Sequence, residues 1–322
     1  MSQPALLPET NLDALPPVFA AWFRARGWEP HPHQLEMLAA AEAGQSALLI
    51  APTGGGKTLA GFLPSLVDLA ESPHDGLHTL YISPLKALAV DIHRNLTQPI
   101  EEMGLDITCE TRTGDTPQSK RQRQRRRPPG ILMTTPESLA LLLSYYDAPQ
   151  VFAGLKCVVI DELHAFAGTK RGDLLALSLA RLQSLSPGLR RVGLSATVHD
   201  PDWLAAWLSP TAAPTDVRRV IGRDGAEAEV EILTTQEYLP WSGHMAVHAL
   251  AEVYARIKTA GTTLVFVNTR AQAEIVFQEL WHLNEEGLPI ALHHGSLAVE
   301  QRRKVEAAMA AGKLRAVVAT SS

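Results

Sequence analysis

The chain has 322 residues, of which 46% are hydrophobic and 20% are charged, and its formal net charge is −5. This length exceeds one ordinary domain and the composition excludes wholesale disorder, so we expect two hydrophobic cores. No apolar run reaches the roughly 20 residues needed to cross a bilayer, and residues 1–10 lack the pattern of a secretion signal. These features predict a cytoplasmic protein with no membrane partner.

Apolar runs alternate with helix-like segments along the first part of the chain, a pattern typical of parallel α/β sheets. Two helices are expected ahead of the first strand, over residues 17–26 and 34–43. Strands are expected over residues 46–50, 77–82, 106–110, 131–134, 157–160 and 192–194. Residues 201–229 mix Pro, Asp, Gly and Arg, and this composition favours a domain exit and linker.

A second alternation follows the expected linker. Its strands are predicted over residues 230–233, 263–267, 290–293 and 316–319, and its helices over residues 243–259, 270–284 and 299–311. The chain therefore divides into two predicted domains, residues 1–225 and residues 226–322. Two cysteines, Cys109 and Cys157, lie in expected strands without metal-ligand spacing, so we interpret them as reduced packing residues and expect no zinc.

A glycine-rich loop joins the first strand to the following helix. This setting is typical of a phosphate-binding loop, although Ala51 stands where the first glycine is usual. Backbone N–H groups and the helix N-terminus would hold the phosphates of ATP or GTP, with Lys57 on the outer phosphates and the Thr58 hydroxyl on Mg²⁺. The candidate triphosphate-binding residues of the loop are Thr53, Gly54, Gly55, Gly56, Lys57 and Thr58.

A pair of acids follows the expected strand over residues 157–160. A carboxylate at the carboxyl end of a strand beside the phosphate loop is placed to hold Mg²⁺, and its neighbour can accept a proton from the attacking water. We therefore assign Asp161 to the metal and Glu162 to the general base, and we count Lys57 with them as catalytic.

Further motifs stand in the order found in superfamily 2 helicases of the DExH type, which the chain resembles from about residue 18 to its end. Gln34 resembles the glutamine that reads adenine, and one of Trp22, Phe23 and Trp28 either stacks on the base or packs in the core. Six further segments resemble the motifs of this family. They are residues 83–88 (motif Ia), 134–139 (Ib), 161–164 (II), 195–197 (III), 264–270 (IV) and 317–322 (the opening of V).

Other details are similar to the large helicase-related (Lhr-type) branch of these helicases. Gly114-Asp115-Thr116 before an arginine-rich stretch and His293-His294-Gly295-Ser296-Leu297 both look like that branch, and most like its bacterial form associated with DNA ligase. The resemblance implies an α/β fold of tandem RecA-like P-loop domains with mainly parallel sheets, the second domain being incomplete.

The resemblance also implies roles for residues outside the ATP site. His164, Ser195 and Thr197 would couple the state of ATP to domain movement. Backbone contacts to single-stranded nucleic acid would come from Pro84, Lys86, Gly114, Thr135 and Pro136 in the first domain and from Asn268, Thr269, Arg270 and Thr320 in the second.

A basic run lies between two of these expected nucleic-acid loops. Residues 112–127 hold seven Lys and Arg residues against one acid, Asp115. Such a run can be a solvated helix face, but the absence of interleaved acids favours contacts with phosphates, and Arg121 and Arg123 are our candidates there.

The chain ends within the part that resembles motif V, and no Gln-x-x-Gly-Arg-x-Gly-Arg stretch of motif VI occurs in it. We therefore expect the N-terminal motor segment of a longer protein, one that binds ATP but hydrolyses it poorly alone. The resemblance implies an ATP-dependent helicase or translocase that acts on single-stranded DNA in repair with 3′–5′ polarity, with a ligase or a nuclease as repair partners.

Several alternatives remain open on the residues alone. Backbone contacts carry little information about the 2′-hydroxyl, so RNA or a DNA–RNA hybrid is an alternative substrate. A nucleic-acid clamp or remodeler that cycles without unwinding shares all of these motifs. A metabolic P-loop enzyme such as a kinase would need an acceptor site and no second α/β domain.

Overall fold

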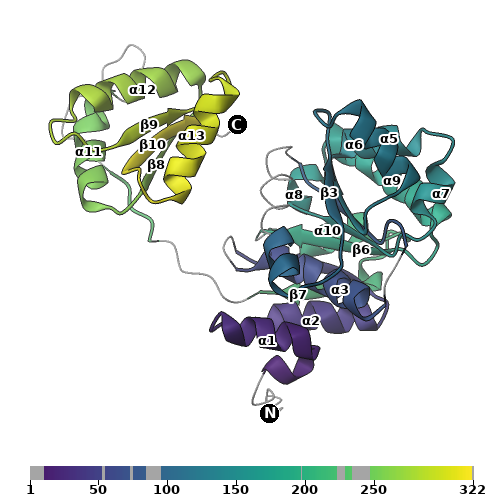
Figure 1. Ribbon diagram of the computed structural model, residues 1–322. Coiled ribbons are helices and arrows are strands. Elements are labelled where there is room, and N and C mark those ends of the chain that lie inside the picture. Colours follow the sequence, from purple (N-terminus) through teal and green to yellow (C-terminus); the bar gives the residue numbers. More distant parts are fainter. Residues whose placement is uncertain are drawn as a thin grey trace. The chain divides into compact units, whose positions relative to one another are not determined.

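The computed structural model has two compact units, residues 1–227 and 228–322, each built on its own parallel sheet with helices around it (Figure 1). The structure describes residues 11–52, 55–72, 75–84, 96–196, 198–222, 229–233 and 247–320. The alternation of strands and helices in the sequence correctly predicted this α/β architecture. Within these ranges, no helix combines the length and apolar character of a membrane span.

The first unit contains a seven-stranded sheet with the order β3-β4-β2-β5-β6-β1-β7. Its strands are β1 (Ser46–Ile50), β2 (Thr79–Ile82), β3 (Cys109–Arg112), β4 (Ile131–Thr134), β5 (Cys157–Ile160), β6 (Arg190–Ser195) and β7 (Val217–Ile221). Every neighbouring pair is parallel. The carboxyl ends of all seven strands therefore meet at one edge, which we call the carboxyl edge.

Helices cover both faces of this sheet. Successive side chains of a strand point to opposite faces, so one strand contributes to the core on each side. Leu49 packs on one side in a core shared with the first three helices, and Leu48 and Ile50 pack on the other side with the later ones. The first group is α1 (Pro17–Ala25), α2 (Pro32–Glu42) and α3 (Lys57–Glu71). The second group is α6 (Pro136–Leu143), α7 (Ala148–Phe152), α8 (Leu163–Phe166), α9 (Lys170–Leu185) and α10 (Pro201–Leu208).

The described part of the first unit also contains η1 (Asn11–Ala14), α5 (Gln118–Arg126) and η2 (Pro214–Asp216), and residues 96–102 are helical. The linker expected over residues 201–229 is wrong for most of its length, because α10, η2 and β7 all belong to this unit. In β7 only Val217 and Val220 are buried, and Arg218, Arg219 and Ile221 are exposed. This edge strand therefore lacks the apolar run that marks a central one. The strand expected over residues 106–110 begins at Cys109 instead.

The second unit has a three-stranded parallel sheet with the order β8-β10-β9. Its elements are η3 (Val247–Ala249), α11 (Leu250–Thr259), β8 (Thr263–Val267), α12 (Arg270–His282), β9 (Ile290–His293), α13 (Val299–Ala310) and β10 (Ala316–Thr320). The strand expected over residues 230–233 is wrong: this segment is irregular, and Val230 and Ile232 are each 85% exposed. The first part of the expected helix 243–259, residues 243–246, lies outside the described residues.

Both cysteines lie in strands and are free thiols. Cys157 is buried in β5, whereas Cys109 is half-buried in β3. Burial, followed by the charge of Glu110, raises the pKa of Cys109 to about 12. Burial also raises the pKa of Cys157. Both side chains therefore stay protonated and poorly nucleophilic at neutral pH.

Candidate nucleotide and nucleic-acid sites

The glycine-rich loop leaves β1 at the carboxyl edge and enters α3 at Lys57. Gly56 has a φ of +71°, a left-handed conformation that favours glycine, and a Cβ there would lie 2.9 Å from Nε2 of Gln34. The Lys57 ammonium donates a hydrogen bond to the carbonyl oxygen of Ala51 at 2.8 Å. This bond holds the Lys57 side chain across the loop. Outer phosphates bound there would compete with the Ala51 carbonyl oxygen for the ammonium. Thr53 and Gly54 lie outside the described residues.

The acids Asp161 and Glu162 follow β5 at the same edge. Asp161 is 7% exposed, and its Oδ1 accepts a hydrogen bond from the backbone N–H of Glu162 at 3.0 Å. Glu162 has a φ of +47°, although it is not a glycine. Such strain costs on the order of 1–3 kcal/mol and clusters at functional sites. It turns the chain sharply between the two carboxylates, so that one is buried and the other faces outward.

A histidine joins this pair to the end of β6. His164 Nδ1 lies 3.0 Å from Oγ of Ser195, and its Nε2 lies 3.4 Å from Oε2 of Glu162. The structure therefore brings together Glu162, His164 and Ser195, residues that are up to 33 positions apart in sequence. Thr197, the other expected coupling residue, lies outside the described residues.

Gln34 is buried beside the phosphate loop. Its Oε1 accepts a hydrogen bond from the backbone N–H of His31 at 2.9 Å, and its Nε2 lies 3.5 Å from the carbonyl oxygen of Gly56. The carboxamide thus caps the start of α2 and touches the loop. Contact with adenine remains a prediction for this residue.

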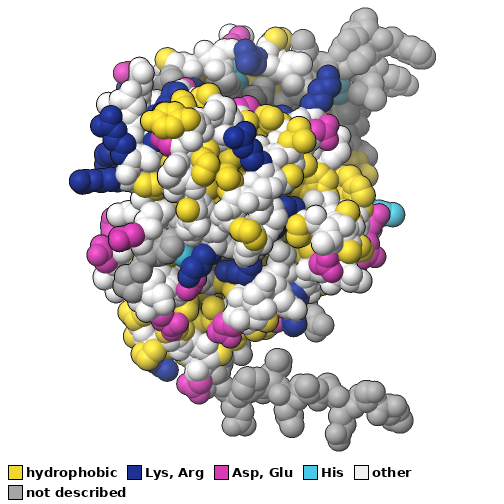
Figure 2. All heavy atoms as spheres, turned by 90° about the vertical axis from the view of Figure 1, so that its right-hand side faces the viewer, with side chains coloured by type: hydrophobic (Ala, Val, Ile, Leu, Met, Phe, Trp, Pro, Cys, Tyr) yellow, Lys and Arg dark blue, Asp and Glu magenta, His cyan; other side chains and the backbone are white. Residues whose placement is uncertain are grey.

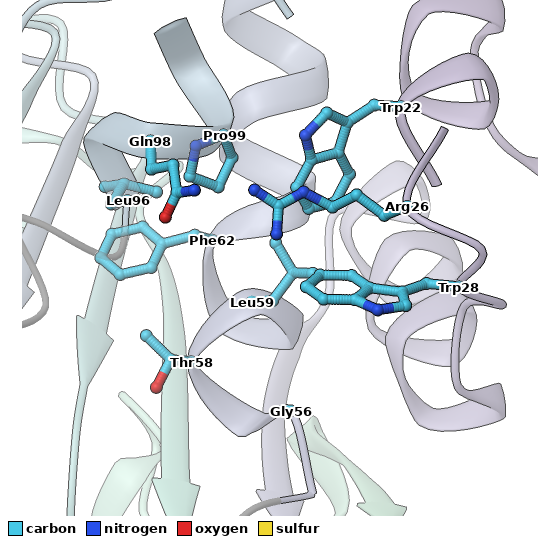
Figure 3. A pocket seen from close by; sticks show the side chains of 10 residues that line it. All are labelled: Trp22, Arg26, Trp28, Gly56, Thr58, Leu59, Phe62, Leu96, Gln98 and Pro99. Carbon is cyan, nitrogen blue, oxygen red and sulfur yellow. The ribbon is translucent and has the colours of Figure 1, made fainter. Parts of the chain in front are cut away.

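A cavity of about 290 Å³ opens next to the loop (Figure 3). Gly56 and Thr58 line one end of it, and the aromatic rings of Trp22 and Trp28 line another. The Arg26 guanidinium lies between these rings, 5.1 Å from the centroid of Trp22 and 4.7 Å from that of Trp28. The two rings stand at 90° to each other, and together with Arg26 they form what we call the wall of the cavity. Aromatic surface beside a phosphate loop is suited to a nucleobase.

The exposure of the three candidate aromatic residues separates them. Phe23 is buried in the core, and Trp22 is 7% exposed and donates its Nε1–H to Glu102 at 2.7 Å. Trp28 is 48% exposed, the most of the three, although the Arg26 guanidinium lies over part of its ring. Hydrogen bonds from Arg26, Trp22 and Gln98 lower the pKa of Glu102 to about 2, so this carboxylate stays charged and holds the wall in place.

The expected nucleic-acid loops of the first unit lie side by side. Pro84, Gly114 and Thr135 follow β2, β3 and β4, which are adjacent strands in the sheet. Thr135 caps α6 by accepting a hydrogen bond from the N–H of Ser138, and Pro136 begins that helix. Lys86 lies outside the described residues. Four of the five expected residues are thus gathered at one part of the carboxyl edge.

Arg171 at the start of α9 links two of these loops, and sequence reasoning missed it. Its Nη1 donates to the carbonyl oxygen of Pro84 at 2.8 Å, and its Nε donates to Glu137 Oε1 at 2.6 Å. The hydrogen bond from Arg171 is the largest influence on Glu137 and lowers the pKa of that carboxyl. Its partners are 34 and 87 positions away, so no local pattern marks this residue.

Most of the basic run is engaged within the protein. Arg121 donates to the carbonyl oxygens of Thr116 and Gly114, and Arg123 pairs with Glu110 at 2.6 Å. Arg125 pairs with Asp147 at 2.7 Å. On the face shown in Figure 2, Lys and Arg side chains lie in separate groups among hydrophobic and acidic ones. Arg121 therefore shapes the Gly114 loop, and contact of Arg121 and Arg123 with phosphates stays a prediction.

The second unit also gathers its four candidates at one edge of its sheet. Asn268 and Thr269 follow β8, and Thr269 caps α12 by accepting a hydrogen bond from the N–H of Gln272 at 3.2 Å. Arg270 donates to Oγ of Ser296 at 2.6 Å. Thr320 ends β10, where it pairs with Val267 of β8.

Known families match both units of the chain. Residues 31–203 match the DEAD/DEAH box helicase family, and residues 245–322 match the helicase conserved C-terminal domain. The Lhr helicase/probable uracil glycosylase of Mycolicibacterium smegmatis is 38% identical over 94% of this chain and 23% of its own length. The ATP-dependent helicase Lhr-Core protein 2 of Thermococcus barophilus is 35% identical over 94% of this chain and 37% of its own length.

A solved structure gives the same likeness. The helicase Lhr of Mycobacterium smegmatis bound to ssDNA and AMP-PNP has a TM-score of 0.80 and 37% identity, covering 97% of this chain and 42% of that one. The chain thus spans less than half the length of each of these relatives.

Proposed function

The chain belongs to the DEAD/DEAH box helicases, and within them to the Lhr type, and on this premise we propose that it is the ATP-dependent motor of a nucleic-acid translocase. The observation that carries the proposal is the carboxyl edge of the seven-stranded sheet. Lys57, Asp161, Glu162 and the His164–Ser195 contact all lie where strands end on that edge. In this proposal residues 1–225 and 226–322 are the two RecA-like halves of the motor.

ATP binding would use the loop and the adjoining cavity. The Lys57 ammonium would exchange the carbonyl oxygen of Ala51 for the outer phosphates, gaining a charge-assisted contact. The base would lie against Trp28, whose exposed ring faces the cavity that Gly56 and Thr58 also line. Gln34 would then read the adenine edge from its position at the loop.

The oxygen atoms at this edge fit Mg²⁺, which prefers hard oxygen ligands. Thr58 offers a hydroxyl at the first turn of α3, and the buried Asp161 offers a carboxylate that accepts one backbone hydrogen bond. When bound, the metal would offset the negative charge of the phosphates. Glu162, which is more exposed, would orient the attacking water and accept its proton.

His164 would pass the state of this site to the neighbouring loop. Because its two ring nitrogens face Glu162 and Ser195, a change in the position of Glu162 alters the hydrogen bond to Ser195. Ser195 begins the segment that includes Thr197. In the proposal these residues couple hydrolysis to movement of the two halves.

Single-stranded DNA is the proposed substrate. A 37% identical relative is described with ssDNA, and the loops at Pro84, Gly114 and Thr135 are clustered where a strand could be held by its backbone. We extend the proposal to 3′–5′ polarity, to DNA repair in the cytoplasm and to a ligase or nuclease as partner. RNA is the alternative substrate, because backbone grip does not read the 2′-hydroxyl.

The proposal is tested by steady-state ATP turnover without nucleic acid, with single-stranded DNA and with single-stranded RNA. Lys57→Ala serves as the blank, and Lys313→Ala in the second unit is the matched lysine control. Stimulation by DNA above RNA supports the proposal. Measurable turnover at equal rates with and without either strand would contradict a translocase, whereas ATP binding without turnover is the result expected of a segment that hydrolyses ATP poorly alone.

Polarity and unwinding need a separate assay on partial duplexes with a 3′ or a 5′ single-stranded tail. The proposal expects displacement from the 3′-tailed duplex only. ATP turnover without displacement from either duplex would identify a clamp or remodeler instead.

A further inference from the structure

Tyr81 is a buried tyrosine close to the acids of the ATP site. It lies in β2 with 0% of its surface exposed, and its ring stacks on Phe62 of α3 with centroids 4.7 Å apart and planes 16° apart. Its hydroxyl oxygen is buried and makes no hydrogen bond of regular distance and angle with any described residue. A buried hydroxyl without a partner costs stability, so its presence needs a reason.

The register of the sheet places Tyr81 close to Asp161 at the end of the neighbouring strand. Tyr81 pairs with Val159 of β5, and both side chains lie in the core on the α3 side of the sheet. Asp161 is two residues beyond Val159, so its side chain starts from that same side, about 6–7 Å closer to the carboxyl edge. The backbone N–H of Asp161 also bonds the carbonyl oxygen of Ile82 at 2.9 Å, which keeps the two strands together at this point.

Electrostatics agrees with this placement. Burial, followed by the charge of Asp161 and a hydrogen-bond interaction with its carboxylate, raises the pKa of Tyr81 well above its ordinary value. The hydroxyl therefore lies near this carboxylate, although the geometry falls short of a regular hydrogen bond. A phenol is a hydrogen-bond donor and a carboxylate is an acceptor, so the two groups match chemically. Phe62 lines the cavity next to the loop, so Tyr81 lies directly behind a residue that lines the nucleotide site.

We propose that Tyr81 is a positioning residue that donates a hydrogen bond to the Asp161 carboxylate when Mg²⁺ and the nucleotide are bound. This inference rests on the proposed function, since it concerns the same site. One oxygen of Asp161 already accepts the N–H of Glu162. A second donor would fix the rotation of the carboxylate and leave its remaining lone pairs for the metal. Removing a group that hydrogen-bonds to a metal ligand typically lowers metal affinity by about 10–100-fold.

Tyr81→Phe tests this inference because it removes the hydroxyl and keeps the ring that stacks on Phe62. Two quantities are measured on the full chain: the melting temperature without ligand, and the Mg²⁺ concentration that half-saturates binding of a fluorescent ATP analogue. We expect an unchanged or higher melting temperature, because the lost hydroxyl is buried and makes no hydrogen bond of regular geometry in the free protein. We expect the half-saturating Mg²⁺ concentration to rise about 10-fold, at the lower end of that range.

Tyr254→Phe is the matched control, since the Tyr254 hydroxyl bonds Oδ1 of Asn284 at 3.0 Å in the second unit. It should lower the melting temperature and leave the Mg²⁺ dependence unchanged. A Tyr81→Phe protein with an unchanged Mg²⁺ dependence overturns the inference, whatever its melting temperature.

Asp161→Asn separates this inference from the function on which it rests. If Asp161→Asn raises the required Mg²⁺ and Tyr81→Phe does not, only the role of Tyr81 is wrong. If neither substitution changes the Mg²⁺ dependence, the assignment of Asp161 to the metal fails as well. Because the hydroxyl acts through Asp161, the double variant should need no more Mg²⁺ than Asp161→Asn alone.

Discussion

Replacing Gly56 with alanine should damage both the fold and the nucleotide site. The left-handed backbone of this residue costs an L-amino acid about 1–2 kcal/mol. The new Cβ would also lie 2.9 Å from Nε2 of Gln34, which must move and lose hydrogen bonds worth about 1 kcal/mol. The sum is about 2–3 kcal/mol.

Gly44→Ala is a matched control for this substitution. Gly44 has a nearly equal φ of +68° and nothing within 4 Å of the new Cβ, so it carries the backbone cost alone. For a unit of this size, about 1 kcal/mol lowers the melting temperature by about 2–4 °C. We therefore expect a loss of about 2–8 °C for Gly44→Ala and about 4–12 °C for Gly56→Ala.

The assay is thermal unfolding combined with titration of AMP-PNP. Gly56→Ala should weaken AMP-PNP binding, because Gly56 lines the cavity and leads into Lys57, whereas Gly44→Ala should bind AMP-PNP like the wild type. Equal melting temperatures and equal AMP-PNP affinities for the two variants would refute the reasoning, since the contact with Gln34 would then have no consequence.

Three further predictions follow from the described contacts. Trp28→Ala should weaken ATP binding about 10-fold with little change in melting temperature, because its half-exposed ring contacts the base and contributes little to the core. An unchanged ATP affinity in a titration would show that Trp28 does not contact the nucleotide. Burial opposes the charge of Asp68, but its hydrogen bonds and ion pairs with His78 and Lys156 lower its pKa overall. The stability that this pairing contributes is therefore present above about pH 4 and should be lost as the pH falls further. Asp68→Asn should flatten that acid-side loss in unfolding curves, and an equally steep loss would contradict the pairing. Replacing the exposed Arg126 and Arg127 with Gln should lower, by about 1.4, the slope with which the logarithm of single-strand affinity falls with the logarithm of salt concentration. An unchanged slope would show that these two side chains are solvated and do not contact phosphates.

The parts of the site that local patterns encode could be predicted from the sequence. An apolar strand, a glycine-rich loop and a Lys-Thr pair are contiguous, and so are β5 and its two acids. The α/β fold follows from the same alternation. The edge strand β7 was missed because Arg218 and Arg219 interrupt its apolar character. The apolar residues of segment 230–233 alternate with acids, a pattern that predicts a strand, but they are exposed and have no core to pack against.

Contacts between distant residues could not be predicted in this way. The basic run looks unpaired in the sequence because its acids lie elsewhere: Glu110 precedes Arg123 by 13 positions, and Asp147 follows Arg125 by 22. Arg171 and Tyr81 carry no motif, since their importance comes from the strands and loops that the fold sets beside them. Chain topology, which the sequence shows only coarsely, determines these pairs.

The central claim, that ATP binding at the carboxyl edge is coupled to the grip on nucleic acid, is tested most directly by measuring affinity for single-stranded DNA with and without AMP-PNP and Mg²⁺. Because coupling between two ligands is reciprocal, the account predicts tighter DNA binding with the nucleotide in the wild type and no tightening in Lys57→Ala. The same DNA affinity with and without AMP-PNP, in a wild-type protein shown to bind the nucleotide, would contradict it.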